Sequence, residues 1–211
     1  MIEAVLWDFG GVILTSPFEA FARYERSIGL PEGTIRQLNA TNPDTNAWAK
    51  LERTEVDLPA FCALFETEAL AAGHTLVGQD VLGCLSGDVR PQMVEAQWRI
   101  KEAGVRQALL TNNFVSGQQA DMGSTRPEVE AAMSVYDLVI ESSKAGVRKP
   151  DPAAYQLVLD ALDLPARSMV FLDDLGINLK PARALGMTTI KVVDPDDALD
   201  ELSKVLGIPL N

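Results

Sequence analysis

Short apolar runs alternate with helical patterns over most of the chain. The first run, Ala4 to Trp7, ends at Asp8 and a glycine pair, as a buried strand does where it stops at a tight turn. Similar runs cover 105–110, 138–141, 169–172 and 188–193. Helical patterns separate or follow them at 91–103, 152–162, 178–185 and 197–206, with Gly104 and Gly186 placed as helix stops. This alternation predicts an α/β fold in which helices cover both faces of a parallel sheet.

The segment from Pro17 to about Ser86 differs, because it contains helical periodicity and no strand-like run. We interpret it as a small helical bundle inserted after the first strand, with most of its aromatic side chains in the bundle core and a few as candidates to face a ligand. The predicted domains are an α/β core over 1–15 and 88–211 and a helical cap over 16–87. Hinges are expected at 15–17 and 86–89.

Two other segments carry weaker signals. The stretch from Asn112 to Glu128 is long and irregular, and loops of that length in compact domains are often functional. The acidic segment from Asp194 to Glu201 is best explained as a solvated helix start, where carboxylates suit the helix dipole.

Composition and charge narrow the classes of function. The chain has 211 residues, of which 47% are hydrophobic and 23% charged, as in ordinary globular proteins. Its 18 Lys and Arg against 30 Asp and Glu give a net charge of −12, the wrong sign for a nucleic-acid partner. No apolar run approaches the roughly 18 residues of a membrane span, and no signal peptide is evident. We therefore expect a cytoplasmic protein with no membrane partner.

Cysteine and histidine are scarce. Cys62, Cys84 and His74 are too few for a Cys/His zinc site and leave no obvious base for Ser-His or Cys-His chemistry. We expect both thiols to be buried in helices without a redox role. Catalysis would then depend on carboxylates, lysine, hydroxyls or a hard metal ion.

Polar residues follow four of the predicted strands. In an open parallel sheet, ligands bind beyond the carboxyl ends of the strands. Each of these residues alone has an ordinary explanation as a turn former, a helix cap or a surface cation. Together they provide a carboxylate nucleophile, a hydroxyl and amide pair, a cation and a second acidic cluster, which suits an anionic substrate with magnesium. The segments are Asp8, 111–113, 148–150 and 173–174.

Four motifs in this order resemble those of the haloacid dehalogenase (HAD) superfamily. They are Asp8-Phe9-Gly10-Gly11-Val12-Ile13, Leu110-Thr111-Asn112, Lys149-Pro150-Asp151-Pro152 and Leu172-Asp173-Asp174-Leu175-Gly176-Ile177-Asn178. The chain is most similar to the phosphatase domain at the N-terminus of soluble epoxide hydrolases and to the related domain fused to some acyl-CoA dehydrogenases. The resemblance implies a three-layer Rossmann-like core with an inserted helical cap.

The resemblance also implies a role for each motif residue. Asp8 would be the nucleophile that forms an aspartyl-phosphate, and Lys149 would neutralise charge on the phosphate and the carboxylate. Thr111 and the backbone of Asn112 would hold the transferring oxygens. Mg²⁺ would bind an oxygen of Asp8, the carbonyl of Gly10 and the side chain of Asp174. Asp173 would orient these ligands without binding the ion, and Asn178 would brace the loop.

Gly10 departs from the usual phosphatase pattern, in which an aspartate at this position serves as general acid and base. Such assistance is typically worth ~10²–10⁴-fold in rate. The glycine could reflect a leaving group that needs no proton. Alternatively, it could be required by a positive φ angle or by close approach of the cap.

Three functions remain open from the sequence. The first is a magnesium-dependent phosphatase acting on a small phosphorylated metabolite, with weak or selective activity. The second is a nearly inactive domain that binds a phosphometabolite or a protein partner. The third is a 2-haloacid dehalogenase. The pair Asp173-Asp174 disfavours it, because the dehalogenase branch of the superfamily looks metal-free and has no acidic pair in the fourth motif. The oligomeric state is also open, with a homodimer through the cap or the 112–128 loop as one alternative.

Overall fold

Five parallel strands form the centre of the protein. The computed structural model describes residues 2–85, 87–113 and 127–210. Within them the strand order is β3-β2-β1-β4-β5, so the first strand lies in the middle of the sheet. The strands are β1 (Ala4–Trp7), β2 (Arg106–Thr111), β3 (Leu138–Glu141), β4 (Met169–Asp173) and β5 (Thr188–Lys191).

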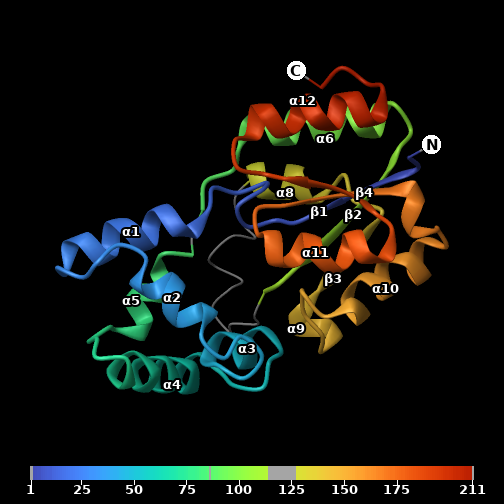
Figure 1. The fold of residues 1–211 in the computed structure, drawn as a ribbon. Coiled ribbons are helices and arrows are strands. Elements are labelled where there is room, and N and C mark those ends of the chain that lie inside the picture. The colour runs from blue at the N-terminus through green and yellow to red at the C-terminus, as the bar shows by residue number, and fades with distance from the viewer. Residues whose placement is uncertain (1, 86, 114–126, 211) are drawn as a thin grey trace.

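Helices cover both faces of this sheet (Figure 1). One face packs against α6 (Pro91–Glu102), α8 (Pro127–Met133) and α12 (Pro195–Leu206), and the other against α10 (Pro152–Leu162) and α11 (Gly176–Leu185). The predicted three-layer α/β fold is confirmed. A short helix that the sequence analysis did not predict, α9 (Ser142–Ala145), follows β3.

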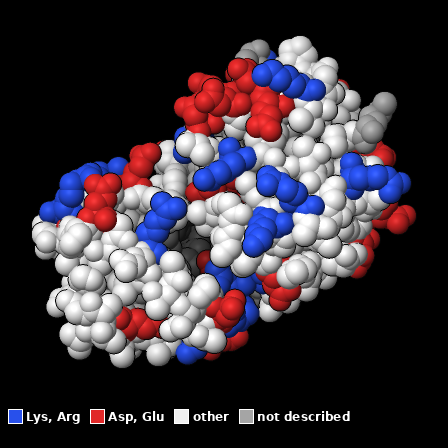
Figure 2. Space-filling view, viewed as in Figure 1, with Lys and Arg blue, Asp and Glu red and all other residues white. Residues whose placement is uncertain are grey.

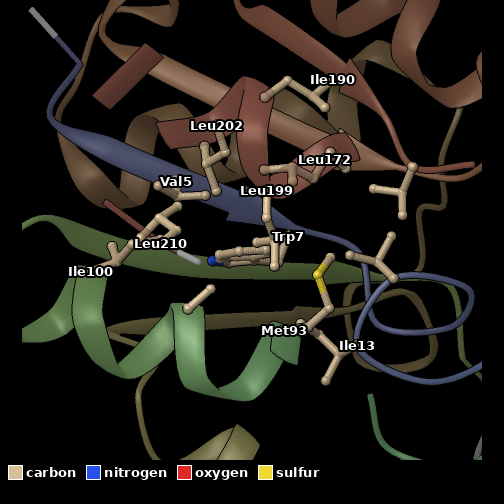
Figure 3. Packing of buried hydrophobic residues seen from close by; sticks show 14 of the residues in the cluster. Val5, Trp7, Ile13, Met93, Ile100, Leu172, Ile190, Leu199, Leu202 and Leu210 are labelled. Atoms are coloured by element: carbon tan, nitrogen blue, oxygen red, sulfur yellow. The ribbon is translucent and has the colours of Figure 1, made fainter. Parts of the chain in front are cut away.

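Alternate side chains of the central strand fill the two halves of the core. Val5 and Trp7 point to the α6/α12 side, and Ala4 and Leu6 to the α10/α11 side. Figure 3 shows Trp7 between strand and helix residues of the first half. Its indole nitrogen donates to Oε1 of the buried Gln107 at 3.1 Å, so the polar atom of this large side chain is satisfied inside the core.

In its described residues, the inserted segment forms five helices with a hydrophobic cluster of their own. They are α1 (Pro17–Ser27), α2 (Thr34–Ala40), α3 (Ala47–Glu52), α4 (Leu58–Ala71) and α5 (Gly78–Gly83), which we call the helical insert. Trp48 packs edge-on against Phe61, with ring centroids 4.7 Å apart, and Phe61 stacks on Phe65. These aromatic side chains belong to the core of the insert, as predicted.

The two connections of the insert to the sheet run side by side. Leu14 forms a β-bridge with Val89, and the backbone N–H of Thr15 donates to the carbonyl of Asp88 at 2.8 Å. Both contacts fall at or beside the predicted hinges, although Ser86 lies outside the described residues. The division into core and cap domains remains a prediction.

Several boundaries differ from the prediction. The last strand ends at Lys191, leaving Val193 exposed, and α11 and α12 each begin two residues earlier than expected. Of the segment 112–128, which was expected to be irregular, Glu128 belongs to α8, and residues 114–126 lie outside the described part of the chain. Both cysteines are half-buried rather than buried, and Cys84 follows the end of α5. Asp194 caps α12, so the acidic segment does start a helix.

Candidate active site

Asp8 and Asp173 lie side by side because β1 and β4 are neighbours. Trp7 is in register with Leu172, and the backbone N–H of Asp8 donates to the carbonyl of Leu172 at 2.9 Å. Both carboxylates therefore project from the carboxyl edge of the sheet, and both are buried. Figure 2 shows a hollow between the helical insert and the α/β core, with charged atoms at its edge.

Lys149 joins the two carboxylates. Its Nζ lies 2.8 Å from Oδ1 of Asp8 and 2.7 Å from Oδ2 of Asp173, and only 1% of its side chain is exposed. Burial acts to lower the pKa of Lys149, but the two carboxylates outweigh it and the pKa is raised. The lysine therefore carries a fixed positive charge at the base of the site.

Asp173 and Asp174 are adjacent in sequence but differ in their contacts. Oδ1 of Asp173 accepts from the backbone N–H of Leu175 and from Nδ2 of Asn178, and Oδ2 accepts from Lys149 and the same amide. Both oxygens of Asp173 are thus fully used by the protein. Asp174 accepts one long hydrogen bond of 3.4 Å from Oγ of Ser16, so its carboxylate has free lone pairs.

Three carboxylates come close enough to share a cation. One oxygen each from Asp8, Asp173 and Asp174 lies within 4.8 Å of the others. Burial raises the pKa of Asp8 well above its usual value, even though Lys149 opposes this. Burial, with the charge of Asp173, raises the pKa of Asp174 to about 6. An all-oxygen site with excess negative charge suits Mg²⁺, which would neutralise it.

Gly11 makes room for Asp174. Its φ is +79°, and a Cβ there would lie 2.3 Å from an oxygen of Asp174. Gly10 is different, because it is exposed, its φ is not positive, and a Cβ added to it would have no described atom within 4 Å. The alternative that Gly10 is required by a positive φ angle or by close approach of the cap therefore does not hold among the described residues. The close approach occurs one residue later.

The residues after β2 lie next to this cluster. Thr111 is the last residue of β2, which pairs with β1, and it is half-buried. The side chain of Asn112 is not free, because its amide hydrogen-bonds to both backbone groups of Lys149 at 2.9 Å. Its backbone role in holding phosphate oxygens, like the roles of the Thr111 hydroxyl and the Gly10 carbonyl, remains a prediction.

Three supporting residues were not among the predicted site residues. Ser16 contacts Asp174, and Tyr155 donates through its hydroxyl to the carbonyl of Asn178 at 2.6 Å. Arg148 lies beside the predicted lysine and pairs with Glu52 of the insert. Only Arg148 carried a signal in the sequence, its place next to Lys149, since the others act through the folded structure. The structure brings the remaining predicted residues together. They are Asp8, Lys149, Asp173, Asp174 and Asn178.

Comparison with known proteins gives the same family as the four sequence motifs. A family model of the haloacid dehalogenase-like hydrolases matches residues 2–186. The chain belongs to this family. It is 34% identical to mouse acyl-CoA dehydrogenase family member 10 and 30% identical to pig bifunctional epoxide hydrolase 2, over 99% of the chain in each case. The chain spans only 20% and 40% of the length of these two relatives.

Two further similarities concern phosphate chemistry. The phosphatase MT3486 of Mycobacterium tuberculosis is 30% identical over 88% of the chain and 85% of its own length. A solved HAD family enzyme from Bacteroides thetaiotaomicron, in complex with magnesium and inorganic phosphate, superposes with a TM-score of 0.61 at 17% identity, covering 90% of this chain and 94% of that one. The second likeness shows the fold alone.

Within the described residues of our chain, no helix is both long and apolar enough to cross a membrane.

Proposed function

We propose that this HAD-family hydrolase is a magnesium-dependent phosphatase that hydrolyses a small phosphorylated metabolite through an aspartyl-phosphate on Asp8. The observation that carries the proposal is the pair of contacts from Lys149 to Asp8 and Asp173. The carboxylate of Asp174, which has free lone pairs, lies beside them. Similarity to a mycobacterial phosphatase over most of both chains supports the same reaction class.

Asp8 attacks the phosphorus atom, and the bond from phosphorus to the leaving oxygen breaks. Water then cleaves the aspartyl-phosphate, which releases inorganic phosphate and restores the carboxylate. Lys149, held by Asp173, orients Asp8 and offsets the negative charge that the carboxylate and phosphate bring together. Thr111 and the backbone of Asn112 bind the transferred phosphoryl oxygens.

Asp8, Asp174 and the carbonyl of Gly10 would hold the magnesium ion. When bound, the ion supplies positive charge that lowers the cost of bringing a carboxylate to a phosphate dianion. The clustered carboxylates and the raised pKa values of Asp8 and Asp174 fit this assignment. We assign Asp173 to orienting the other ligands and not to the ion itself, because both of its oxygens already accept hydrogen bonds from the chain.

Gly10 limits the substrates that this site converts quickly. With no carboxyl group at position 10, leaving groups that are stable as anions suffer least, since general acid assistance is worth ~10²–10⁴-fold. We therefore propose faster turnover of acyl and aryl phosphates than of alkyl phosphates. The same glycine favours a second candidate function, in which the chain binds a phosphometabolite with little turnover.

A panel assay separates these functions. Phosphate release is measured from acyl, aryl, sugar and alkyl phosphates with magnesium and with a chelator, using Asp8→Asn as the matched control. Magnesium-dependent release that disappears in Asp8→Asn is expected. Binding of phosphate esters without release would establish the second candidate instead. Halide release from a 2-chloroacid, independent of magnesium, would overturn the phosphatase assignment in favour of a dehalogenase.

A further inference from the structure

An ion pair links the helical insert to the segment that carries Lys149. Glu52, the last residue of α3, contacts Nε of Arg148 through Oε2. The side chains are 17% and 19% exposed, so both charges are largely removed from water. Arg148 immediately precedes Lys149, whose ammonium group lies between Asp8 and Asp173.

Two more polar contacts join the same surfaces. Nη1 of Arg148 donates to the carbonyl of Pro43 at 2.9 Å, and Oγ1 of Thr54 donates to the carbonyl of Ser143 at 3.0 Å. Pro43 and Thr54 lie on either side of α3, so the insert touches the core around Glu52 as well as at its two chain connections.

A pocket lies beside the ion pair, between the helical insert and the core. It has a volume of about 400 Å³ and is lined by Asp44 and Arg53 of the insert and by Gly146, Val147, Arg148, Pro150, Asp151 and Pro152 of the core. The lining contains both charged and apolar residues, and the pocket leaves space between the two surfaces on this side of the ion pair.

Burial disfavours the charged form of Glu52. Burial raises the pKa of Glu52, and the attraction of Arg148 and Lys149 only partly offsets this. Buried ion pairs of this kind are often no more stable than uncharged replacements, whereas they do fix geometry. A contact that costs desolvation and lies next to the active-site lysine is better explained by positioning than by folding energy.

We propose that Glu52 and Arg148 form a latch that couples the position of the helical insert to that of Lys149. When the latch is closed, α3 fixes residue 148 from the insert side, and the Asn112 amide fixes residue 149 from the core side. Opening of the insert releases the first restraint. Closure over a substrate and placement of Lys149 against Asp8 thereby occur together.

Hydrogen–deuterium exchange tests the latch without any assay of activity. The variants are Glu52→Gln, Arg148→Met and the two combined. Glu32→Gln is the matched control, because it breaks an exposed ion pair with Arg26 elsewhere in the insert. We expect faster exchange of backbone amides over 143–150 in both single variants, unchanged exchange in β1 and β4, and no change in the control.

The double variant shows whether Glu52 and Arg148 act through one shared contact or independently. A latch predicts that Glu52→Gln adds nothing once Arg148 is Met, because either change alone opens it. Exchange over 143–150 that stays at the wild-type rate in Glu52→Gln would overturn the proposal, as would additive effects in the double variant. A melting temperature close to that of the wild type ensures that a local change is being measured.

The kinetic consequence rests on the phosphatase function proposed above. Misplacement of Lys149 should lower kcat/KM by about tenfold or more in Glu52→Gln, with no change in Glu32→Gln. Wild-type kcat/KM in Glu52→Gln, with measurable turnover, would contradict the coupling to Lys149. If the wild-type protein hydrolyses no phosphate ester, the proposed function fails while the exchange experiment still decides whether the latch exists.

Discussion

The side chain of Asn112 binds the backbone of Lys149 on both sides of the residue. Nδ2 of Asn112 donates to the carbonyl of Lys149, and Oδ1 accepts from its N–H, each at 2.9 Å. This paired contact ties the end of β2 to a segment 37 residues later in the chain. The amide of Asn112 therefore acts as a positioning group for the lysine that contacts Asp8.

Asn112→Asp tests this contact with a nearly isosteric change. A carboxylate can still accept from the N–H of Lys149 but cannot donate to its carbonyl, and the two oxygens then repel each other. We expect kcat/KM to fall by about tenfold to a hundredfold, a loss of ~1.4–2.7 kcal/mol in transition-state stabilisation. Steady-state kinetics measure it, with Asn112→Ala for comparison. A variant that works as well as the wild type would show that the backbone of Lys149 needs no such support.

Much of this site could be predicted from the sequence, because strand ends are local features. Apolar runs ending in Asp8 and Asp173 mark buried strands, and parallel strands place their carboxyl ends at one edge. Lys149 was placed by its motif, and the structure brings its ammonium group to both aspartates. These parts of the fold follow from patterns confined to a few consecutive residues.

The remaining parts depend on contacts between distant segments. No local pattern predicts that Glu52 forms an ion pair with Arg148. The two residues are 96 positions apart, and in the sequence each resembles an ordinary surface charge. The different contacts of Asp173 and Asp174 likewise depend on the backbone N–H of Leu175, just before α11, and on the side-chain amide of Asn178 within it. The side-chain role of Asn112 was missed for the same reason, as its partner is a backbone.

Asp8→Asn should abolish turnover and leave the fold intact. The amide has nearly the same shape as the carboxylate but is a poor nucleophile and a weak ligand for magnesium. It also removes one of the two negative charges that contact Lys149, while Asp173 keeps the lysine paired. The checks are phosphate release and a melting curve. Residual activity above about a tenth of wild type, in folded protein, would remove Asp8 from the nucleophile's role.

Replacing the adjacent aspartates by alanine should have opposite effects. Asp173→Ala removes the carboxylate that accepts from Asn178 and one of the two carboxylates that contact Lys149, and should lower the free energy of unfolding by ~3–5 kcal/mol. Asp174→Ala removes a poorly paired, repelled carboxylate and should leave the metal-free protein as stable as before or more so. It should nevertheless raise the magnesium requirement sharply. Urea unfolding and magnesium titration measure the two effects, and the reverse order would mean that their roles are exchanged.

Magnesium should stabilise the protein more at higher pH. The pKa of Asp174 in the folded protein is about 6, above its usual value, so the folded state binds this proton more tightly than the unfolded state does. The stability that comes from this tighter proton binding is complete in acid and is lost as the pH rises through about 6. A bound cation replaces the proton. Melting curves should therefore show a larger gain from magnesium at about pH 8 than at about pH 5, and equal gains would argue against binding at Asp174.

The two glycines after Asp8 should respond differently to substitution. Gly11→Ala places a Cβ against the Asp174 carboxylate in a positive-φ position, so we expect lower stability and weaker magnesium binding. Gly10 has neither restriction among the described residues. A melting curve of each variant tests the contrast. Equal destabilisation at both positions would show that the space beside Gly10 is needed for folding.

Gly10→Asp then tests what limits the chemistry. Because the new side chain has room, the variant should fold, bind magnesium and leave Asp8, Lys149 and Asp174 in place. A carboxyl group two residues after the nucleophile can protonate the leaving oxygen, so rates on alkyl phosphates should rise by up to ~10²-fold. Rates on aryl and acyl phosphates should change little, because those groups leave without a proton. Turnover of an alkyl and an aryl phosphate by the same preparation measures the difference. A stable, magnesium-binding Gly10→Asp protein with no gain on any alkyl phosphate would show that a missing general acid is not what limits this site.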